Sequence, residues 1–503
     1  MKQLGCATLD GFDAKAVEVE VAFVRALPGF SIVGLAQTSI QESRERIKSA
    51  LSAIGFKFPP QKITVNLSPS DLKKEGSHFD LPIALLIALQ KNENINFNDF
   101  MVFGELGLDG RLKDTATLFA IILSLAKEGI AKKIIIPHES LEKISKIPGL
   151  TLYPAKTLQE AIDIFTHPDN ALKINSGESL NYPFITVDNQ RYYYSENYPV
   201  DFLDIKGQEH AKRAALIAAC GMHNILFEGS PGCGKSMSAK RLPYILPPMS
   251  LDEILEKAKL DALEGKEPDF DVVRPHRAPH HSATRASLFG GGSKQARIGE
   301  VSLANHGMLF FDEIPHFPKT ILESLREPLE DHHLLISRVN TKIRYQTKFL
   351  FVAAMNPCPC GNLLSTAKPC RCSELEITRY KKRLSAPLLD RIDLYVQMSE
   401  ITPHDRPTVS SRQMHEIVRR VFTVQKARGQ SELNGKLTDR EIQTHCTLDT
   451  ESQTILDNAV SRFDLSQRAI NKTRKVARTI ADIEGHTHIQ KSDLLEALQY
   501  RFR

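Results

Sequence analysis

The chain has 503 residues, of which 42% are hydrophobic and 25% charged, as in a folded globular protein of about two to four domains. A formal net charge of +5 is too small to indicate nucleic-acid binding, because a local basic surface matters more than the sum. The sequence has no apolar run long enough for a membrane span and no secretory signal. We therefore expect a cytoplasmic protein without a membrane partner, whose cysteines are free thiols or metal ligands.

Residues 1–167 alternate short strand-like runs with helical ones. Segment 16–21 alternates apolar and charged residues as a half-buried strand does, and the runs at 63–67, 101–104 and 134–137 also favour strands. Helical periodicity is present at 40–54, 81–90 and 118–128. The pattern predicts an α/β domain at 1–167, followed by a polar, turn-rich linker at 168–203 that contains a short strand at 184–187.

Continuous apolar runs dominate the next part of the chain, at 224–228, 308–311 and 349–355. Strands that are apolar on both faces, separated by helices, indicate a parallel sheet that helices cover on both sides. Residues 401–503 are mostly helical in pattern. The predicted fold class is α/β, with a parallel-sheet domain at 204–400 and a helical domain at 401–503 after the N-terminal α/β domain.

A phosphate-binding loop is predicted at 229–236, where the sequence reads GSPGCGKS. It matches G-x-x-x-x-G-K-[ST] and lies between the strand-like NILFE and a helix-compatible SAKRL, as the motif requires. Backbone N–H groups of such a loop close around phosphates, and we expect Lys235 to reach the β and γ oxygens and Ser236 to bind Mg²⁺. The predicted nucleotide-binding residues are Gly229, Ser230, Pro231, Gly232, Cys233, Gly234, Lys235 and Ser236.

Polar side chains follow the next two apolar runs. Asp312 and Glu313 come directly after 308–311, and Asn356 comes directly after 349–355. Ligands of parallel sheets lie beyond the carboxyl ends of the strands, so we expect Asp312 to hold Mg²⁺, Glu313 to polarise the attacking water and Asn356 to contact the γ-phosphate or its water. An acid pair after a strand is also common as a helix cap. Its combination with the loop at 229–236 favours an ATPase.

Four cysteines follow Asn356 as two C-x-C pairs, Cys358 with Cys360 and Cys370 with Cys372. Four thiolates can hold a tetrahedral zinc ion, but structural pairs are usually separated by about two to four residues, and one intervening residue is tight. A structural zinc site is the favoured interpretation, and free or redox-sensitive thiols are the alternative.

The phosphate loop, the strand followed by Asp-Glu and the strand followed by Asn resemble, in this order, an AAA+ ATPase. DIKGQ at 204–208, RAPHHS at 277–282, NPCPCG at 356–361 and LLDRID at 388–393 resemble the Mg-chelatase-like branch known as the YifB or ComM family. The resemblance covers essentially the whole chain. It implies ATP and Mg²⁺ as cofactors, a homo-oligomeric ring that is usually a hexamer, and a DNA helicase that drives branch migration in homologous recombination during natural transformation.

The resemblance also assigns two arginines. Arg391 in LLDRID matches the family's arginine finger, which enters the neighbouring subunit's site, and Arg468 in LSQRA matches the sensor arginine of the helical lid. A finger of this kind stabilises charge that grows on the γ-phosphoryl oxygens. Hydrolysis would then be coupled to assembly of the ring.

The first domain resembles the Lon-type protease fold through LKKEGSHFDLP at 72–82 and FGEL at 103–106. Where active members carry the serine nucleophile, this chain has His78 and Phe79, with Ser77 one position early, and no matching lysine follows Gly110. A Ser-Lys dyad needs both partners within hydrogen-bond reach. We therefore expect an inactive domain with a scaffold, ring-contact or DNA-binding role.

Two basic segments are predicted to contact DNA. Segment 270–298 carries several cations, Arg274 and Arg277 among them, and segment 337–345 is predicted as a β-hairpin that carries Arg338, Lys342 and Arg344. In ring helicases such loops line the pore, where cations follow phosphates without reading sequence. The predicted partners are single-stranded or branched DNA, bound without sequence specificity, and recombination proteins.

Three functional hypotheses follow. The first is an ATP-hydrolysing AAA+ ring motor on DNA, most concretely a branch-migration helicase. The second is a protein-remodelling ATPase of the Mg-chelatase type that does not act on DNA. The third, a Lon-like ATP-dependent protease, is disfavoured by the missing dyad.

Overall fold

The structure is a computed structural model that describes residues 2–92, 95–177, 179–291, 297–337, 342–366 and 368–501. It divides into two compact units. The first runs up to Asn181 and includes Leu255–Phe270, and the second consists of Tyr182–Ile254 and the chain from Asp271 onward. Among the described residues, no helix combines the length and the apolar character that crossing a membrane requires.

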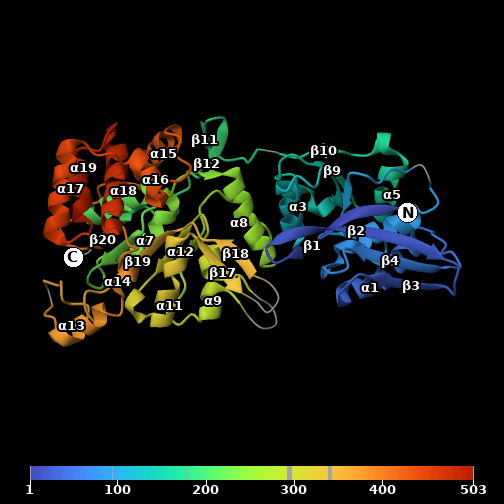
Figure 1. Cartoon of the computed structure of the whole chain (residues 1–503), viewed down its shortest axis with the longest axis horizontal. Coiled ribbons are helices and arrows are strands. Elements are labelled where there is room, and N and C mark those ends of the chain that lie inside the picture. Colours follow the sequence, from blue (N-terminus) through green and yellow to red (C-terminus); the bar gives the residue numbers. More distant parts are fainter. Residues whose placement is uncertain are drawn as a thin grey trace. The chain divides into compact units, whose positions relative to one another are not determined.

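A mixed sheet forms the centre of the first unit (Figure 1). Its strand order is β10-β9-β8-β5-β1-β2-β4-β3; the pairs β1/β2, β2/β4 and β9/β10 are antiparallel and the others parallel. The strands are β1 (Gln3–Asp10), β2 (Asp13–Val24), β3 (Gly29–Val33), β4 (Lys62–Ser68), β5 (Phe100–Val102), β8 (Lys133–Pro137), β9 (Thr151–Ala155) and β10 (Ile174–Asn175). A small ribbon pairs β6 (Glu105–Leu106) with β7 (Leu112–Lys113).

The helices of the first unit cover this sheet because their apolar residues face it. On β2, Val17, Val19 and Val21 are buried on one face while Glu18 is exposed, which is the alternation of a strand with one covered face. Helix α2 is apolar all round, and its residues from Asp80 to Ile87 are all buried. The helices are α1 (Thr38–Ala53), α2 (Asp80–Ala88), α3 (Leu118–Lys127), α4 (Leu141–Ile144) and α5 (Leu158–Thr166).

The predicted parallel sheet is confirmed in the second unit. Its strand order is β15-β16-β19-β13-β20, and every neighbouring pair is parallel. The strands are β13 (Ile225–Glu228), β15 (His276–Arg277), β16 (Met308–Phe311), β19 (Leu350–Met355) and β20 (Leu394–Gln397). Glu228 lies opposite Met355 and Phe311 opposite Ala353, so the carboxyl ends of β13, β16 and β19 meet at one edge.

The two faces of this sheet belong to two hydrophobic clusters. Phe227, Phe310 and Val352 pack on one face with residues of α6 and of the C-terminal helices. Their chain neighbours, such as Leu226 and Phe351, pack on the other face with residues of α9, α11 and α12. Because consecutive residues of a strand point to opposite faces, burial on both faces requires the continuous apolar runs seen in the sequence.

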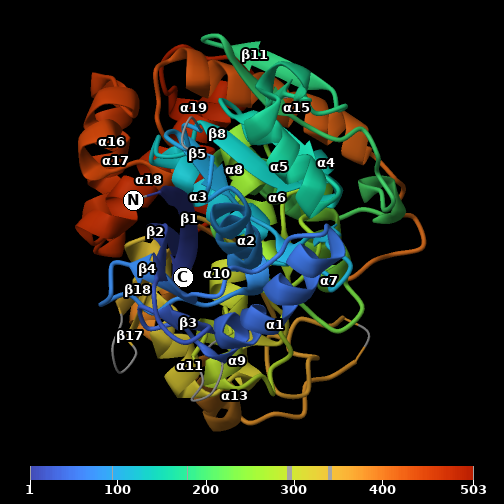
Figure 2. The same cartoon turned by 90° about the vertical axis from the view of Figure 1, so that its right-hand side faces the viewer.

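The helices of the second unit lie on the two sides of its parallel sheet. Helices α15–α19 are grouped on one side, and α9, α11 and α13 lie on the other (Figures 1 and 2). The predicted helical C-terminal region is thus confirmed. The bounds are α6 (Glu209–Gly221), α7 (Lys235–Arg241), α8 (Leu251–Leu263, which continues into the first unit), α9 (Arg285–Phe289), α10 (Glu300–Leu303), α11 (Lys319–Ser324), α12 (Arg326–Glu330), α13 (Glu374–Lys381), α14 (Ala386–Leu389), α15 (Ser411–Ala427), α16 (Asp439–His445), α17 (Thr450–Phe463), α18 (Gln467–Glu484) and α19 (Lys491–Gln499).

Two hairpins complete the second unit. Strands β11 (Phe184–Val187) and β12 (Gln190–Tyr193) form a hairpin that pairs with β14 (Met249–Ser250), so the sequence predicted as a linker contains ordered structure of this unit. Strands β17 (His333–Ser337) and β18 (Lys342–Gln346) form the second hairpin, in which Ser337 pairs with Lys342.

Candidate active site

The phosphate loop connects the carboxyl end of β13 to the start of α7. Gly232 and Gly234 have φ angles of +84° and +98°, a region that residues with a Cβ rarely adopt, so these two positions favour glycine. At Gly229 a Cβ would lie 2.6 Å from Cys233 Sγ, which explains why a third glycine is required. The local sequence therefore folds into a tight loop whose backbone can approach a phosphate closely.

Lys235 lies inside this loop. Its Nζ donates to the carbonyl oxygens of Gly229 at 2.6 Å and Ser230 at 2.9 Å, and to Asn356 Oδ1 at 3.1 Å. Burial lowers the pKa of Lys235, and nearby acidic groups oppose that shift. One ammonium group thus joins the loop to the end of β19, and the contact of Lys235 and Asn356 with a γ-phosphate stays a prediction.

The acid pair lies at the adjacent strand end. Ser236 Oγ donates to Asp312 Oδ2 at 2.7 Å, which places the two predicted Mg²⁺ ligands side by side. Glu313 has a φ of +50° and is exposed, and its N–H donates to Asp312 Oδ1 at 2.9 Å. A positive φ is uncommon for a residue with a Cβ, and here it occurs where the chain leaves the end of β16.

The residues present fit a nucleotide with Mg²⁺. Ser230 Oγ is buried and has no hydrogen-bond partner among the described residues, so a phosphate oxygen would satisfy it. The Ser236 hydroxyl and the Asp312 carboxylate are oxygen donors of the kind Mg²⁺ prefers. Lys235 supplies the positive charge that phosphates require.

Glu330 joins the two predicted arginines. Arg391 and Arg468 both form ion pairs with the Glu330 carboxylate, although Arg391 follows α14 and Arg468 lies at the start of α18. Arg391 is also held by the carbonyl oxygens of Arg326 and Pro387. The structure places the two arginines together, and sequence reasoning missed Glu330 because no motif marks it.

The four predicted zinc ligands also come together. The sulfurs of Cys358, Cys360, Cys370 and Cys372 all lie within 4.8 Å of one another. The sulfurs of Cys358 and Cys360 are 3.4 Å apart, so the steric objection to a single intervening residue was wrong. The cluster could therefore bind one metal ion.

The structure supports only part of the DNA-contact prediction for the two basic segments. Arg338 lies outside the described residues, as does the Lys342 side chain, while Arg344 is exposed on β18. The interpretation of Arg274 as a DNA-facing loop residue was wrong, because this side chain is buried and donates to the carbonyl oxygens of Pro247 and Pro248 at 2.7 and 2.8 Å. Its five N–H donors are used inside the protein.

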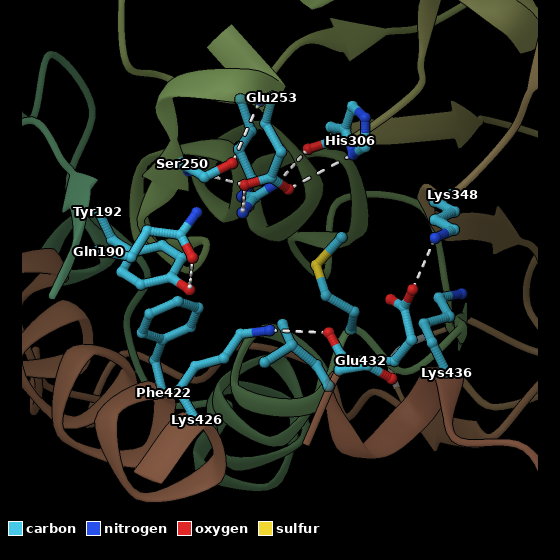
Figure 3. Close-up of a pocket in the computed structure, with 14 residues that line it drawn as sticks. Gln190, Tyr192, Ser250, Glu253, His306, Lys348, Phe422, Lys426, Glu432 and Lys436 are labelled. Atoms are coloured by element: carbon cyan, nitrogen blue, oxygen red, sulfur yellow. Dashed lines mark hydrogen bonds and ion pairs between the residues drawn. The ribbon is translucent and has the colours of Figure 1, made fainter. Parts of the chain in front are cut away.

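The second unit contains a cavity of about 310 Å³, and Figure 3 shows Glu253 and His306 on one side of it and Phe422 and Lys426 on the other. Arg274 also lines this cavity. Its guanidinium lies 3.0 Å from Glu253, and His306 lies 3.4 Å from the same carboxylate. In the same cavity, Lys348 Nζ is 2.6 Å from Glu432 Oε1. These charged groups are paired with one another. Lys426 and Lys436, which also line the cavity, donate to the Ser431 carbonyl oxygen and to Asn224 Oδ1. Such internal contacts are typical of a structural role.

We expect Arg274→Ala to lower the free energy of unfolding by about 3 kcal/mol, because it leaves the mostly buried Glu253 carboxylate without its main partner. Burial alone would raise the pKa of Glu253, but Arg274 and His306 outweigh it and hold this pKa well below its ordinary range. The corresponding stability is present above a pH of about 4.3 and is lost as the pH falls. Arg277→Ala is the control, because its pair with Glu300 is 3.8 Å long and partly exposed. Equal losses in urea unfolding would contradict this assignment.

In the segment predicted to resemble Lon-type proteases, Ser77 and its neighbours make structural contacts. The Ser77 hydroxyl donates to the Glu105 carboxylate, and His78 is buried with Nε2 2.8 Å from the Ala7 carbonyl oxygen. Asp80 is buried in an ion pair with Arg46 at 2.7 Å. These contacts hold the segment in place, and none of them joins Ser77 to a lysine.

A phosphate loop after β13, an acid pair after β16 and an asparagine after β19, followed by a helical region, define the class of a Mg-chelatase-like AAA+ ATPase. Family models agree: residues 201–406 match magnesium chelatase, subunit ChlI; residues 19–140 match subunit ChlI of Mg-chelatase; and residues 408–501 match the C-terminal part of magnesium chelatase, subunit ChlI.

Full-length relatives narrow the class. The chain is 38% identical over 500 residues to competence protein ComM of Haemophilus influenzae and 36% identical over 507 residues to the protein YifB of Salmonella typhimurium, in both cases over 98% of this chain and 95% of the relative. It therefore belongs to the YifB/ComM family of Mg-chelatase-like AAA+ ATPases. Two other proteins are similar over part of the chain. Lon protease of Buchnera aphidicola is 26% identical over 136 residues, and DNA repair protein RadA of Aquifex aeolicus is 36% identical over 105 residues. The α/β fold class is confirmed.

Proposed function

We propose that this chain is a cytoplasmic, Mg²⁺-dependent ATPase that works as a homo-hexameric ring motor on DNA, most concretely as a branch-migration helicase in homologous recombination. The observation that carries the proposal is the meeting of Lys235, Ser236, Asp312 and Asn356 at one edge of the parallel sheet. The likeness to a competence protein and the exposed Arg344 on the β17/β18 hairpin support action on DNA.

Each residue at the sheet edge has a distinct task in this proposal. ATP would supply the phosphoryl group, and Mg²⁺ would neutralise negative charge on it. Lys235 would bind the β and γ oxygens, while Ser236 and Asp312 would hold the metal. Glu313 orients the attacking water and accepts its proton, and Asn356 fixes the γ-phosphate or this water.

We propose that Arg391 and Arg468 act at the boundary between subunits. In the single chain, Glu330 neutralises both guanidinium groups. In the ring, the γ-phosphate of the neighbouring subunit replaces Glu330 as the anionic partner of Arg391, which stabilises charge in the transition state. Glu330 is thus proposed to hold both arginines in position until a neighbour is present.

The proposed cofactors are ATP and Mg²⁺, with a structural Zn²⁺ at the four cysteines. The proposed partners are single-stranded or branched DNA, further copies of the chain and recombination proteins. A protein-remodelling ATPase of the Mg-chelatase type is the second candidate, and the family-model descriptions favour it. A protease is opposed by the contact of Ser77 with Glu105.

DNA is expected to stimulate ATP turnover, and Lys342→Ala with Arg344→Ala is expected to weaken DNA binding. Cations that contact phosphates release counterions, so removing two of them lowers affinity and reduces its dependence on salt concentration by about two units of log–log slope. Fluorescence anisotropy with labelled single-stranded and forked DNA at several salt concentrations measures both effects.

Arg412→Ala with Arg440→Ala removes the same charge from exposed helical positions of the same unit and is the matched control. If the hairpin and control pairs bind DNA alike, the hairpin does not contact DNA. ATP turnover that is indifferent to DNA at low salt would favour the protein-remodelling candidate instead.

A further inference from the structure

The sulfurs of the four-cysteine cluster have the spacing of a tetrahedral metal site. Cys358 Sγ lies 3.4 Å from Cys360 Sγ and 3.7 Å from Cys370 Sγ, and the sulfurs of Cys360 and Cys370 are 3.6 Å apart. Four sulfurs at about 2.3 Å from one tetrahedral zinc ion lie about 3.8 Å from each other. All four cysteines are free thiols in this structure, so no disulfide competes with the metal.

Backbone groups around the cluster also suit thiolates. The backbones of Arg371 and Asn362 hydrogen-bond to the Cys360 sulfur, and the backbone of Cys372 hydrogen-bonds to the Cys370 sulfur. Donors of this kind stabilise negative sulfur and orient it toward a metal. These backbone contacts hold the sulfurs in place around a common centre, and thiolates are the ligands that zinc selects.

The cysteine loop lies directly against the phosphate loop. Gly361 follows Cys360 at a φ of +80°, and a Cβ at this position would lie 2.7 Å from Cδ and 2.8 Å from Cγ of Pro231. Pro231 is a residue of the phosphate loop. Within the cysteine cluster, Cys358 is fully buried. The turn that carries the first cysteine pair thus supports the outer side of the nucleotide-binding loop.

The segment after the cysteines is anchored to the same edge of the sheet. Ser373 caps α13, which begins at Glu374, two residues after Cys372. Tyr380 on α13 hydrogen-bonds to the Asn356 backbone, and Lys381 lies 3.0 Å from Glu228, a buried residue directly before the phosphate loop. The segment from Asn356 to Lys381 therefore begins at the end of β19 and returns to the end of β13, beside the phosphate loop.

We infer that the four cysteines bind one zinc ion that holds this segment in shape and thereby positions the phosphate loop and Asn356 for ATP. The inference deepens the proposed ATPase, since it rests on ATP binding at 229–236. Without the ion, only the local turns and the anchors of α13 hold the two C-x-C pairs, and the support at Pro231 is lost. Nucleotide affinity then depends on zinc at a site that never touches the nucleotide.

The test uses the full-length chain, with zinc measured by elemental analysis and nucleotide affinity by a fluorescent ATP analogue. Wild type is expected to contain about one zinc per chain, and Cys370→Ser with Cys372→Ser to contain none and to bind nucleotide about tenfold more weakly. Gly361→Ala separates the two steps, because it keeps all four ligands but forces Pro231 to move. It should retain zinc and still lose nucleotide affinity.

Cys6→Ala, in the first unit, is the control and should change neither quantity; circular dichroism verifies that each variant is folded. If the double serine variant does not fold, Gly361→Ala carries the test. Wild type without zinc overturns the metal site, and unchanged nucleotide affinity in folded, zinc-free or Gly361→Ala protein overturns the coupling. Zinc-loaded wild type that binds no nucleotide would instead refute the proposed ATPase.

Discussion

A Glu313→Gln chain is expected to bind ATP with near-normal affinity and to hydrolyse it at least about a hundredfold more slowly than wild type. Glutamine retains the shape of the side chain but accepts a proton poorly. Asp312, Ser236 and Lys235, which would hold the metal and the phosphates, keep their contacts. Single-turnover hydrolysis and equilibrium binding of a fluorescent ATP analogue distinguish the loss of chemistry from the loss of binding.

Two further variants make this result interpretable. Lys235→Ala should lose nucleotide binding itself, because it removes the ammonium group that bridges the phosphate loop and Asn356. Glu416→Gln removes an exposed carboxylate on α15 and should behave as wild type. Wild-type turnover in Glu313→Gln would exclude this residue as the base, and normal binding in Lys235→Ala would exclude 229–236 as the phosphate loop.

Arg391→Ala is expected to reduce ATP turnover by about a thousandfold, the lower end of the effect of an arginine finger. Each chain still carries a complete set of sheet-edge residues, so nucleotide binding should persist. Arg391→Lys should recover little, because an ammonium group cannot reproduce the planar fork of donors. Steady-state turnover and nucleotide affinity, measured on the same preparations, provide the comparison.

Mixing experiments determine whether Arg391 acts in the neighbouring subunit. Arg391→Ala chains keep an intact nucleotide site, and Lys235→Ala chains keep an intact arginine, so mixed rings contain some sites that combine both. Turnover should therefore rise above that of either variant alone. If mixtures never exceed the sum of the separate variants, Arg391 does not act in trans, and its pairing with Glu330 is only structural.

The sheet and its edge were accessible from sequence because local rules determine them. Runs such as 349–355 are apolar without interruption only when both faces of a strand are covered, and glycines at 232 and 234 occupy positive φ angles. In a parallel sheet the residue after each strand falls at the same edge, so Asp312 and Asn356 were predicted to meet the phosphate loop. Their position directly after a strand was sufficient to predict where these two residues lie in the fold.

Other features depend on contacts between distant segments, which spacing does not encode. Glu330 is 61 residues from Arg391 and 138 from Arg468, and only the packing of α12, α14 and α18 brings the three together. Arg274 belongs to a segment whose basic composition is typical of a DNA-facing loop. In the fold, its side chain is buried and pairs with Glu253. The spacing of the C-x-C pairs favoured a zinc site although one intervening residue is tight, and only the folded backbone shows that all four sulfurs converge.

The division of the second unit into two hydrophobic clusters has a mechanical consequence. Strands β13, β16 and β19 contribute alternate residues to both clusters, so a small shift of these strands alters packing against the C-terminal helices and against α11 and α12 together. Close-packed interiors transmit such strain rather than absorb it. In the proposed nucleotide cycle, we expect any movement of Asp312 or Asn356 to reach both sides of the unit, since the strands before these residues contact both clusters.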